Sequence, residues 1–313
     1  MPLRIFWDGE PKAHPKCLSA DLCVSASSFG SEQHPNVAFM PTTACEGQGM
    51  CPDWESTTTF DDRPYDILYR SSNCMNNRDN LARVIREEAD RRGLSFIATG
   101  KCTAGGERTH PGDGEREFEG KAQNVVPSTR ACKDCQKAKV MLAFDNFVEG
   151  EPYLSEKVLF PMMNGAVSAY YGNGQDAMDM IGLNREKIID RSDFQSDREF
   201  ATALLDVASD KNKFESLTVK PNFTKDLCGA SNNELYKDIV RAAEHSNRVR
   251  EFKESQTCAQ GVRIQNKSAF LPTASASENI VSAESIVRAL GCKVDTSSKT
   301  NKGSDVVFRG RFE

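Results

Sequence analysis

Polar groups that could bind a ligand gather in one short part of the chain, Lys139 to Gly172. The apolar run Val140 to Phe144 has the length of a buried strand, and Asp145 and Asn146 follow it directly. Open α/β sheets bind ligands at the carboxyl ends of their strands. The pattern therefore predicts a carboxylate and an amide in a ligand site at the edge of such a sheet.

A positive charge and a predicted helix start follow this strand. Ser155 and Glu156 suit the first turn of a helix predicted from about Leu154, where free N–H groups attract phosphate. Lys157 adds a mobile positive charge. Because the next strand is predicted over Ala166 to Tyr171, the unit is strand, loop, helix and strand, with the phosphate chemistry in its loop.

An arginine occupies a comparable position earlier in the chain. A strand predicted over Ile67 to Tyr69 precedes Arg78, which is followed by apolar residues at helical spacing, namely Leu81, Val84, Ile85 and Ala89. Another strand, ending in glycine, is predicted over Phe96 to Gly100. A guanidinium group is planar and donates parallel hydrogen bonds to phosphate oxygens, which Arg78 could provide.

Two carboxylates near the start of the chain could take up protons. Asp8 and Glu10 lie two residues apart in a segment predicted to be extended, and this offset places both side chains on one face. A well-placed carboxylate can accept the proton of a reacting hydroxyl group as a general base, which contributes about 10²–10⁴ in rate.

The elements that must position these groups alternate between strands and helices from about Asp61 to Arg250, which predicts a Rossmann-like parallel sheet. Further along, a strand is expected over Gly261 to Gln265, an amphipathic helix over Glu278 to Leu290 and a strand over Ser304 to Phe308. The Gly-rich, charged run from Cys102 to Asn124 is either a flap over the ligand or a solvated insertion.

These segments together resemble the α1,3/4-fucosyltransferase family, glycosyltransferase family 10. In that family a strand ends in Phe-Glu-Asn, a Tyr-x-x-Glu-Lys element opens a helix, and a strand ending in an aromatic-Gly pair follows. The corresponding elements here are Phe144 to Asn146, Tyr153 to Lys157, and Tyr171 with Gly172. Asp145 replaces the usual Glu, and Phe147 stands where a Ser is common. The resemblance extends over roughly Ile5 to Phe194.

The resemblance implies an α/β, GT-B-like fold of two Rossmann-like domains facing a cleft. It implies an inverting enzyme that transfers L-fucose from GDP-fucose to a glycan hydroxyl of an oligosaccharide or glycoprotein. Glu10 is then the general base, with Asp8 in reserve, and Arg78 and Lys157 stabilise the GDP leaving group. The donor pocket is completed by Asn146, Tyr153 and Glu156.

No cofactor and no metal are expected, because two cations can neutralise the diphosphate. The donor half has no Asp-x-Asp motif at a strand end; the nearest approach, Asp176 and Asp179, has two intervening residues. Two alternatives stay open. The same fold could use another nucleotide sugar, since Asp145 departs from the family pattern, or the chain could be a catalytically silent glycan- or nucleotide-binding module.

The order of the segments predicts a circular permutation. Family members begin with a strand-helix-strand unit, which this chain carries at its other end. Residues 1–60 plus 256–313 would then form the acceptor-binding domain, and residues 61–255 the GDP-sugar donor-binding domain. The alternative is that the C-terminal segment is an unrelated extension and that the unit at the front was trimmed or lost.

Composition narrows the class of protein. The chain has 313 residues, a net charge of −5 and no basic run, which argues against nucleic-acid binding. No apolar stretch approaches the ~20 residues that cross a bilayer, and no signal-peptide core is present. A soluble, cytoplasmic enzyme of a microbe or virus is expected, or a Golgi lumen enzyme whose anchor was removed. Eleven cysteines leave the compartment open. Cys132 and Cys135 have a metal or redox spacing, although structural or incidental thiols are the preferred interpretation.

Overall fold

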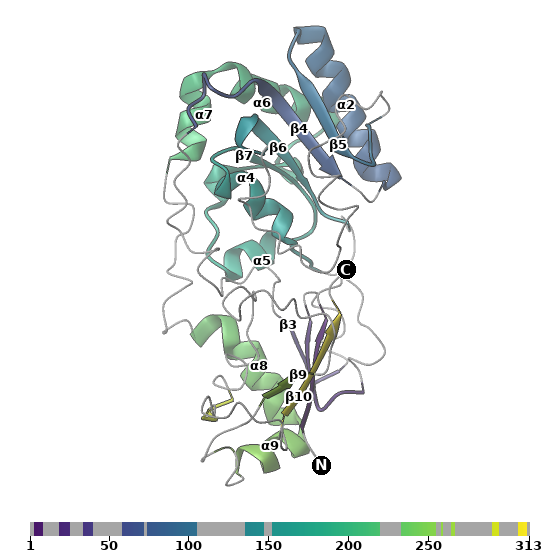
Figure 1. The fold of residues 1–313 in the computed structure, drawn as a ribbon, viewed down its shortest axis with the longest axis vertical. Coiled ribbons are helices and arrows are strands. Elements are labelled where there is room, and N and C mark those ends of the chain that lie inside the picture. The colour runs from purple at the N-terminus through teal and green to yellow at the C-terminus, as the bar shows by residue number, and fades with distance from the viewer. Residues whose placement is uncertain are drawn as a thin grey trace. The chain divides into compact units, whose positions relative to one another are not determined.

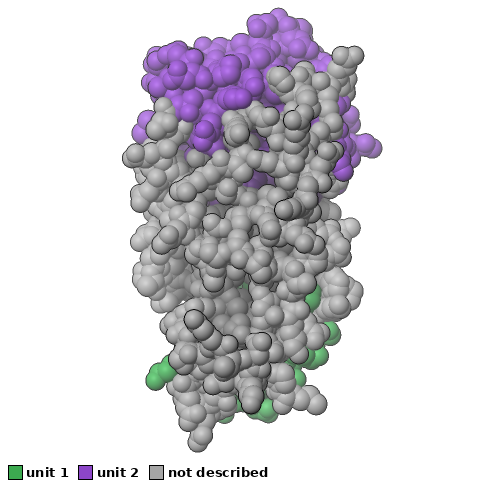
Figure 2. Space-filling model, viewed as in Figure 1, with its two compact units in different colours: residues 1–50, 151–154, 226–313 green, residues 51–150, 155–225 purple. Residues whose placement is uncertain are grey.

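The structure is a computed structural model, drawn in Figure 1. It describes residues 3–8, 19–25, 34–39, 58–71, 74–104, 135–146, 152–219, 233–254, 258, 264–266, 290–293 and 306–311. The chain divides into two compact units, coloured separately in Figure 2. The first unit contains residues 1–50, 151–154 and 226–313, and the second contains residues 51–150 and 155–225.

The second unit is built on a five-stranded parallel sheet. In spatial order its strands are β5 (Phe96–Gly100), β4 (Tyr65–Ser71), β6 (Ala138–Phe144), β7 (Val167–Tyr171) and β8 (Ile188–Asp190). Numbered along the chain, this order is 2-1-3-4-5. The chain therefore moves outward from β4 to β5 on one side and from β6 to β8 on the other. Such a reversal between neighbouring strands is a topological switch point.

Both faces of this sheet are covered, which explains the long apolar run of its central strand β6. On one face α2 (Asn76–Arg92) and α6 (Asp197–Ser209) pack against each other and share a core that includes Leu81, Ile85, Phe144, Phe200 and Leu204. The other face carries a smaller cluster around Leu68 and Met141. The unit's other helical segments are η2 (Cys135–Lys137), η3 (Glu156–Val158), α4 (Leu159–Met163), α5 (Gln175–Met180), η4 (Arg185–Lys187), η5 (Arg191–Asp193) and α7 (Lys211–Thr218).

The first unit is built on another five-stranded parallel sheet. Its spatial order is β3 (Val37–Phe39), β2 (Leu22–Ser25), β1 (Leu3–Asp8), β10 (Val306–Arg311) and β9 (Ile264–Asn266). The connection from β9 to β10 and those from β1 to β2 and from β2 to β3 all advance in the same direction across the sheet, so no two neighbouring strands are followed by connections in opposite directions. The switch-point rule for ligand binding therefore applies to the sheet of the second unit.

In the part of the first unit that the structure describes, two helices attach to this sheet. α8 (Asn233–His245) packs on β2 and β3, and α9 (Asn247–Lys253) packs on β1. The guanidinium of Arg241 donates to the carbonyl oxygen of Val37 at 2.9 Å, and that of Arg248 donates to the carboxylate of Asp21 at 3.2 Å. These contacts explain why residues 226–255 belong to the first unit, whereas the sequence pattern had placed them with residues 61–225.

The two ends of the chain share the first sheet. Leu3 pairs with Val306 and Asp8 with Arg311, in parallel. This pairing is what the permutation hypothesis requires of the two segments, and the permutation itself stays a prediction. Because β1 and β10 are parallel, Leu3 and Arg311 lie at opposite edges of the sheet, so a direct link between them would have to be a crossover.

Disulfides occur in both units. Cys74 is bonded to Cys102 in the second unit, and Cys258 to Cys292 in the first. Cys23 and Cys135 are also disulfide-bonded. Cys135 is therefore not a free thiolate for a metal, and Cys132 lies outside the described residues. Among the described helices, none combines the length and the apolar character needed to cross a membrane.

Candidate functional site

The candidate site lies at the carboxyl edge of the second unit's sheet, at the switch point between β4 and β6. These neighbouring strands end at Ser71 and Phe144. The chain continues from β4 to β5 on one side and from β6 to β7 on the other, and open parallel sheets commonly bind ligands at such a point. Two of the predicted residues fall on this edge: Asn146, which follows β6, and Arg78, in the first turn of α2.

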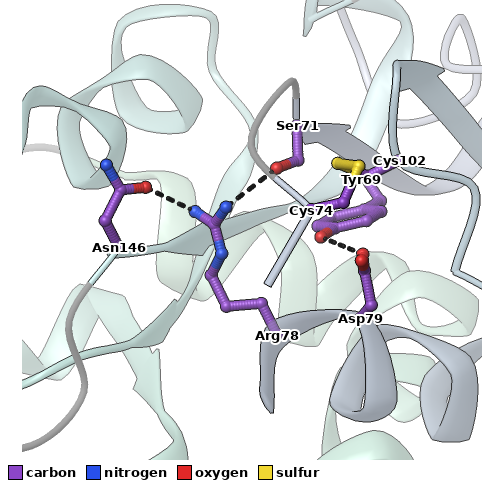
Figure 3. Close-up of a disulfide and its surroundings, with 7 residues drawn as sticks. All are labelled: Tyr69, Ser71, Cys74, Arg78, Asp79, Cys102 and Asn146. Carbon is purple, nitrogen blue, oxygen red and sulfur yellow. Dashed lines mark hydrogen bonds between the residues drawn. A yellow bond between two sulfur atoms is a disulfide. The ribbon is translucent and has the colours of Figure 1, made fainter. Parts of the chain in front are cut away.

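Arg78 joins the ends of both strands. It is the third residue of α2, and only 1% of its surface is exposed. Its Nη2 donates to Ser71 Oγ at 3.2 Å, and its Nη1 donates to Asn146 Oδ1 at 2.8 Å (Figure 3). Nη1 also donates to the carbonyl oxygen of Phe144 at 3.1 Å. The guanidinium is thus held at the switch point by hydrogen bonds from two strands.

The charge of Arg78 persists despite its burial. Burial lowers the pKa of Arg78, and the neighbouring acidic groups of Tyr69, Asp79 and Asp145 act in the opposite direction. An arginine starts from a pKa so high that it stays protonated in proteins. A fixed positive charge therefore lies at the carboxyl ends of β4 and β6.

Lys157 brings a second positive charge to the same amide. It lies in η3 and is half-buried, and its Nζ donates to Asn146 Oδ1 at 3.2 Å. The side-chain oxygen atom of Asn146 thus accepts hydrogen bonds from both cations. Two cations that share a neutral acceptor form a local positive potential, which favours an anionic ligand.

Asp145 anchors the loop that carries Lys157. Its carboxylate is fully buried, and it accepts hydrogen bonds from the Ser155 hydroxyl, from the Ser155 N–H at 3.3 Å and from the Tyr170 hydroxyl at 2.7 Å. Burial, reinforced by this carboxylate, raises the pKa of Tyr170, so the phenol stays protonated and donates. Asp145 therefore serves the protein's own structure, and its contacts fix η3 beside the ends of β6 and β7.

This anchoring corrects the predicted phosphate site at a helix start. The Ser155 N–H, expected to attract a phosphate, donates instead to Asp145. The expected helix is also short, since η3 has three residues and α4 only five. The attraction for an anion at this edge consequently comes from the side chains of Arg78 and Lys157.

Gly172 tests the importance of the Asp145 anchor. A Cβ atom at this position would lie 2.2 Å from the Tyr170 hydroxyl oxygen and 2.8 Å from Asp145 Oδ2. We expect Gly172→Ala to lower the free energy of unfolding by about 1–3 kcal/mol, measured by urea denaturation, because the buried Tyr170 and Asp145 side chains must shift away from the added methyl group. We also expect weaker anion binding, because Lys157 and Asn146 sit on the displaced loop.

Gly93→Ala is the control for this substitution. Gly93 ends α2 with a φ of 68°, and a Cβ there would meet no atom within 4 Å. Its replacement should cost about 1 kcal/mol for the left-handed backbone and leave anion binding unchanged. Equal anion binding by both variants would show that the Asp145 anchor does not set the site.

The structure places the other predicted residues as follows. Tyr153 is 6% exposed and lies in the segment 151–154, which groups with the first unit. Glu156 begins η3, but its side chain is outside the described part. Glu10 is also outside the described residues; it comes two positions after the end of β1. Arg78, Asn146 and Lys157 are therefore the predicted residues that the structure brings together.

Four residues near Arg78 were not predicted as part of the site. The Cys74–Cys102 disulfide lies beside the first turn of α2, and the Tyr69 hydroxyl donates to Asp79 Oδ1 at 2.8 Å (Figure 3). The sequence carried a signal for the disulfide, since one cysteine precedes α2 and the other follows β5. Parallel strands bring such positions to one edge of a sheet.

The same neighbours include possible metal ligands. Cys74, Asp79 and Cys102 place three ligand atoms within 4.8 Å of one another. Zinc binds cysteine as separate thiolates, and here the two sulfurs are bonded to each other. The oxidised cluster is therefore unsuited to a metal.

Comparisons with known proteins identify the fold. No protein-family model matches the sequence, and no curated protein matches it in sequence. Structures of α1,3-fucosyltransferase match with a TM-score of 0.50: the GDP complex has 12% sequence identity, and the match covers 75% of this chain and 73% of that chain. The match with the GDP-fucose complex has 13% identity and covers 82% and 76%, respectively. The predicted α/β, GT-B-like fold class is confirmed by this similarity and by the two parallel sheets.

Proposed function

We propose that this chain is an inverting glycosyltransferase that transfers L-fucose from GDP-fucose to a hydroxyl group of an oligosaccharide or glycoprotein. The observation that carries the proposal is the meeting of Arg78 and Lys157 on Asn146 at the switch point of a Rossmann-like sheet. The fold supports it, because matching structures are α1,3-fucosyltransferases with bound GDP and GDP-fucose.

Arg78 and Lys157 are the proposed ligands of the donor diphosphate. When the bond between the sugar and GDP breaks, negative charge builds up on the departing phosphate oxygen, and preorganised cations stabilise that charge. The Lys157 ammonium has three N–H donors, so it can contact a phosphate while it keeps Asn146. Arg78 is buried, so its contact requires one N–H group to change partner from Asn146 to a phosphate oxygen.

Glu10 is the proposed general base. As the acceptor oxygen attacks the anomeric carbon from the face opposite GDP, its proton passes to the carboxylate of Glu10. The backbone is consistent with this role, because Glu10 follows β1, the central strand of the first sheet. Tyr153 and Glu156 complete the proposed donor pocket by their match to the family pattern.

Metal independence is part of the proposal. The two side-chain cations supply the charge that a divalent metal supplies in other enzymes of nucleotide-sugar chemistry, so chelation should not change donor binding.

The described disulfides also bear on the compartment. Disulfides persist in oxidising environments, which favours the lumenal alternative over the cytoplasmic one.

Calorimetric titration tests the proposal directly. The purified chain is titrated in EDTA with GDP, GDP-fucose, GDP-mannose and UDP sugars. We expect GDP and GDP-fucose to bind, and Lys157→Ala to weaken both. Binding of a UDP sugar alone would show that the chain uses another nucleotide sugar as its donor. Asp145, which replaces the usual Glu of the family pattern, is the residue that raises this alternative. Binding of no nucleotide would leave the silent glycan-binding module.

A further inference from the structure

The Cys74–Cys102 disulfide links the two chain segments that leave β4 and β5 at the site. Cys74 lies just before Met75, the N-cap of α2, and Cys102 lies two residues after the end of β5. Cys74 is exposed, whereas Cys102 is 2% exposed. The disulfide therefore joins an exposed residue, four positions before Arg78, to a buried residue that follows β5.

The buried half of this link is tied closely to β4. The N–H groups of Lys101 and Cys102 both donate to the carbonyl oxygen of Ser71 at 3.0 Å. Gly100 permits this approach, because its φ is 89° and a Cβ there would lie 2.5 Å from the same oxygen. The backbone and the disulfide thus close a ring that runs from Ser71 through the Cys74 loop to Cys102 and back.

Arg78 depends on the same ring at two points. Its Nη2 donates to the hydroxyl of Ser71, the residue whose carbonyl anchors Cys102. Its backbone belongs to the first turn of α2, where the Asp79 N–H donates to the Met75 carbonyl oxygen at 2.9 Å. The Tyr69 hydroxyl holds Asp79 from the β4 side. The disulfide is the covalent member of this set of restraints (Figure 3).

We propose that the Cys74–Cys102 disulfide positions Arg78 for the donor diphosphate, so that the affinity for a diphosphate depends on the oxidation state of this cysteine pair. The inference rests on the proposed function, in which Arg78 contacts the diphosphate. Reduction leaves every ligand group in place and removes only the restraint on the loop before α2. Affinity then falls because binding must order a first turn that the disulfide had already ordered.

A dithiol reductant completes the change. Its thiolate attacks the exposed Cys74 sulfur, the Cys74–Cys102 bond breaks, and the Cys102 thiolate leaves and takes up a proton. The second thiol of the reductant then attacks the mixed disulfide and releases the Cys74 thiol. Two electrons enter the protein pair, and the reductant becomes its own disulfide.

The test compares three forms of the full chain: the wild type, Cys74→Ser/Cys102→Ser, and Cys258→Ser/Cys292→Ser. The last is a matched control, because it removes a disulfide of similar sequence separation, 34 against 28 residues, from the other unit. Pyrophosphate and GDP are the probes, in calorimetric titration. We expect the first variant to lose about five- to tenfold in affinity for both, and the control to lose less than about twofold.

A double-mutant cycle shows whether the disulfide acts through Arg78. Arg78→Lys is measured with and without the disulfide. We expect Arg78→Lys to cost less affinity for pyrophosphate when the disulfide is absent. Without the disulfide, Arg78 is no longer held in position, so replacing it loses less. Additive losses would show a merely structural disulfide and would overturn the inference.

The outcomes separate this inference from the proposed function. If the wild type binds neither GDP nor pyrophosphate, the proposed function is wrong and the inference falls with it. If the wild type binds and the folded Cys74→Ser/Cys102→Ser chain binds equally well, the inference alone is wrong. If that variant does not fold, graded dithiol treatment of the wild type replaces it. Pyrophosphate affinity is then followed against the alkylated fraction of Cys74, and a constant affinity overturns the inference.

Discussion

Replacing Arg78 with alanine is expected to lower kcat/KM for the donor about 10²–10³-fold, the usual effect of removing one preorganised donor from a site of developing charge. The guanidinium holds Ser71, Phe144 and Asn146 together, so its loss also removes three hydrogen bonds at the ends of β4 and β6. We expect the free energy of unfolding to fall by about 2–4 kcal/mol. Steady-state kinetics and urea denaturation measure the two effects separately.

Arg63→Ala is the matched control. Arg63 is another buried arginine of the same unit, 2% exposed. It donates to the carbonyl oxygens of Ala138 at 2.7 Å, Asn164 at 2.9 Å and Thr58 at 3.2 Å. Because Ala138 begins β6, this cluster lies at the amino edge of the sheet, away from the switch point.

The control distinguishes a role in binding from a role in folding. Burial lowers the pKa of Arg63 to about 10, so it too is charged at neutral pH, and its removal should cost stability of a similar size. We expect the Arg63→Ala variant to bind the donor with wild-type affinity under conditions in which it is fully folded. An equal loss of donor affinity in both variants would attribute the Arg78 effect to destabilisation and remove the diphosphate role.

The centre of the site could be predicted from the sequence because it depends on local patterns. The strand before Asn146 is a continuous apolar run, and Arg78 precedes a clear helical periodicity. The first pattern places Asn146 just after a strand, and the second places Arg78 at the start of the helix that follows a strand. The carboxyl ends of parallel strands meet at one edge, so both residues are expected there. Knowledge of which strands are neighbours was not needed for this step.

The partners of Asp145 could not be predicted in the same way. Its position after a strand suggested a group facing a ligand, but the Tyr170 hydroxyl and Ser155 surround it in the fold. Those contacts depend on how β7 and η3 pack beside β6, which the local sequence does not encode. The signal that existed was Gly172, whose missing side chain leaves space for the Tyr170 and Asp145 pair.

The boundary between the units was missed for a related reason. The amphipathic pattern of residues 233–245 predicts a helix with an apolar face, and it contains no information about which sheet that face covers. In the structure α8 covers β2 and β3, strands that lie about 200 positions earlier in the chain. Long-range packing of this kind decides domain membership, whereas periodicity decides only that a helix forms.

Glu10→Gln is expected to lower kcat about 10²–10⁴-fold, the range for loss of a well-placed general base. The carboxamide keeps the shape of the side chain and cannot accept the acceptor's proton. Donor affinity should be unchanged, because the diphosphate ligands Arg78 and Lys157 belong to the other unit. Single-turnover kinetics with GDP-fucose measure the chemical step, and calorimetry measures the donor affinity of the same preparation.

Asp8→Asn shows which of two carboxylates near the end of β1, Asp8 or Glu10, acts as the general base. Asp8 is the last residue of β1, and Glu10 stands two positions further on, so both are candidates for the same proton. If Glu10 is the base, Asp8→Asn keeps most of the rate, and only Glu10→Gln loses the rise of kcat with pH that a titrating base produces. Full activity of Glu10→Gln together with an inactive Asp8→Asn would move the base to Asp8. Full activity of both would place it outside this segment, because neither amide can take up a proton at neutral pH.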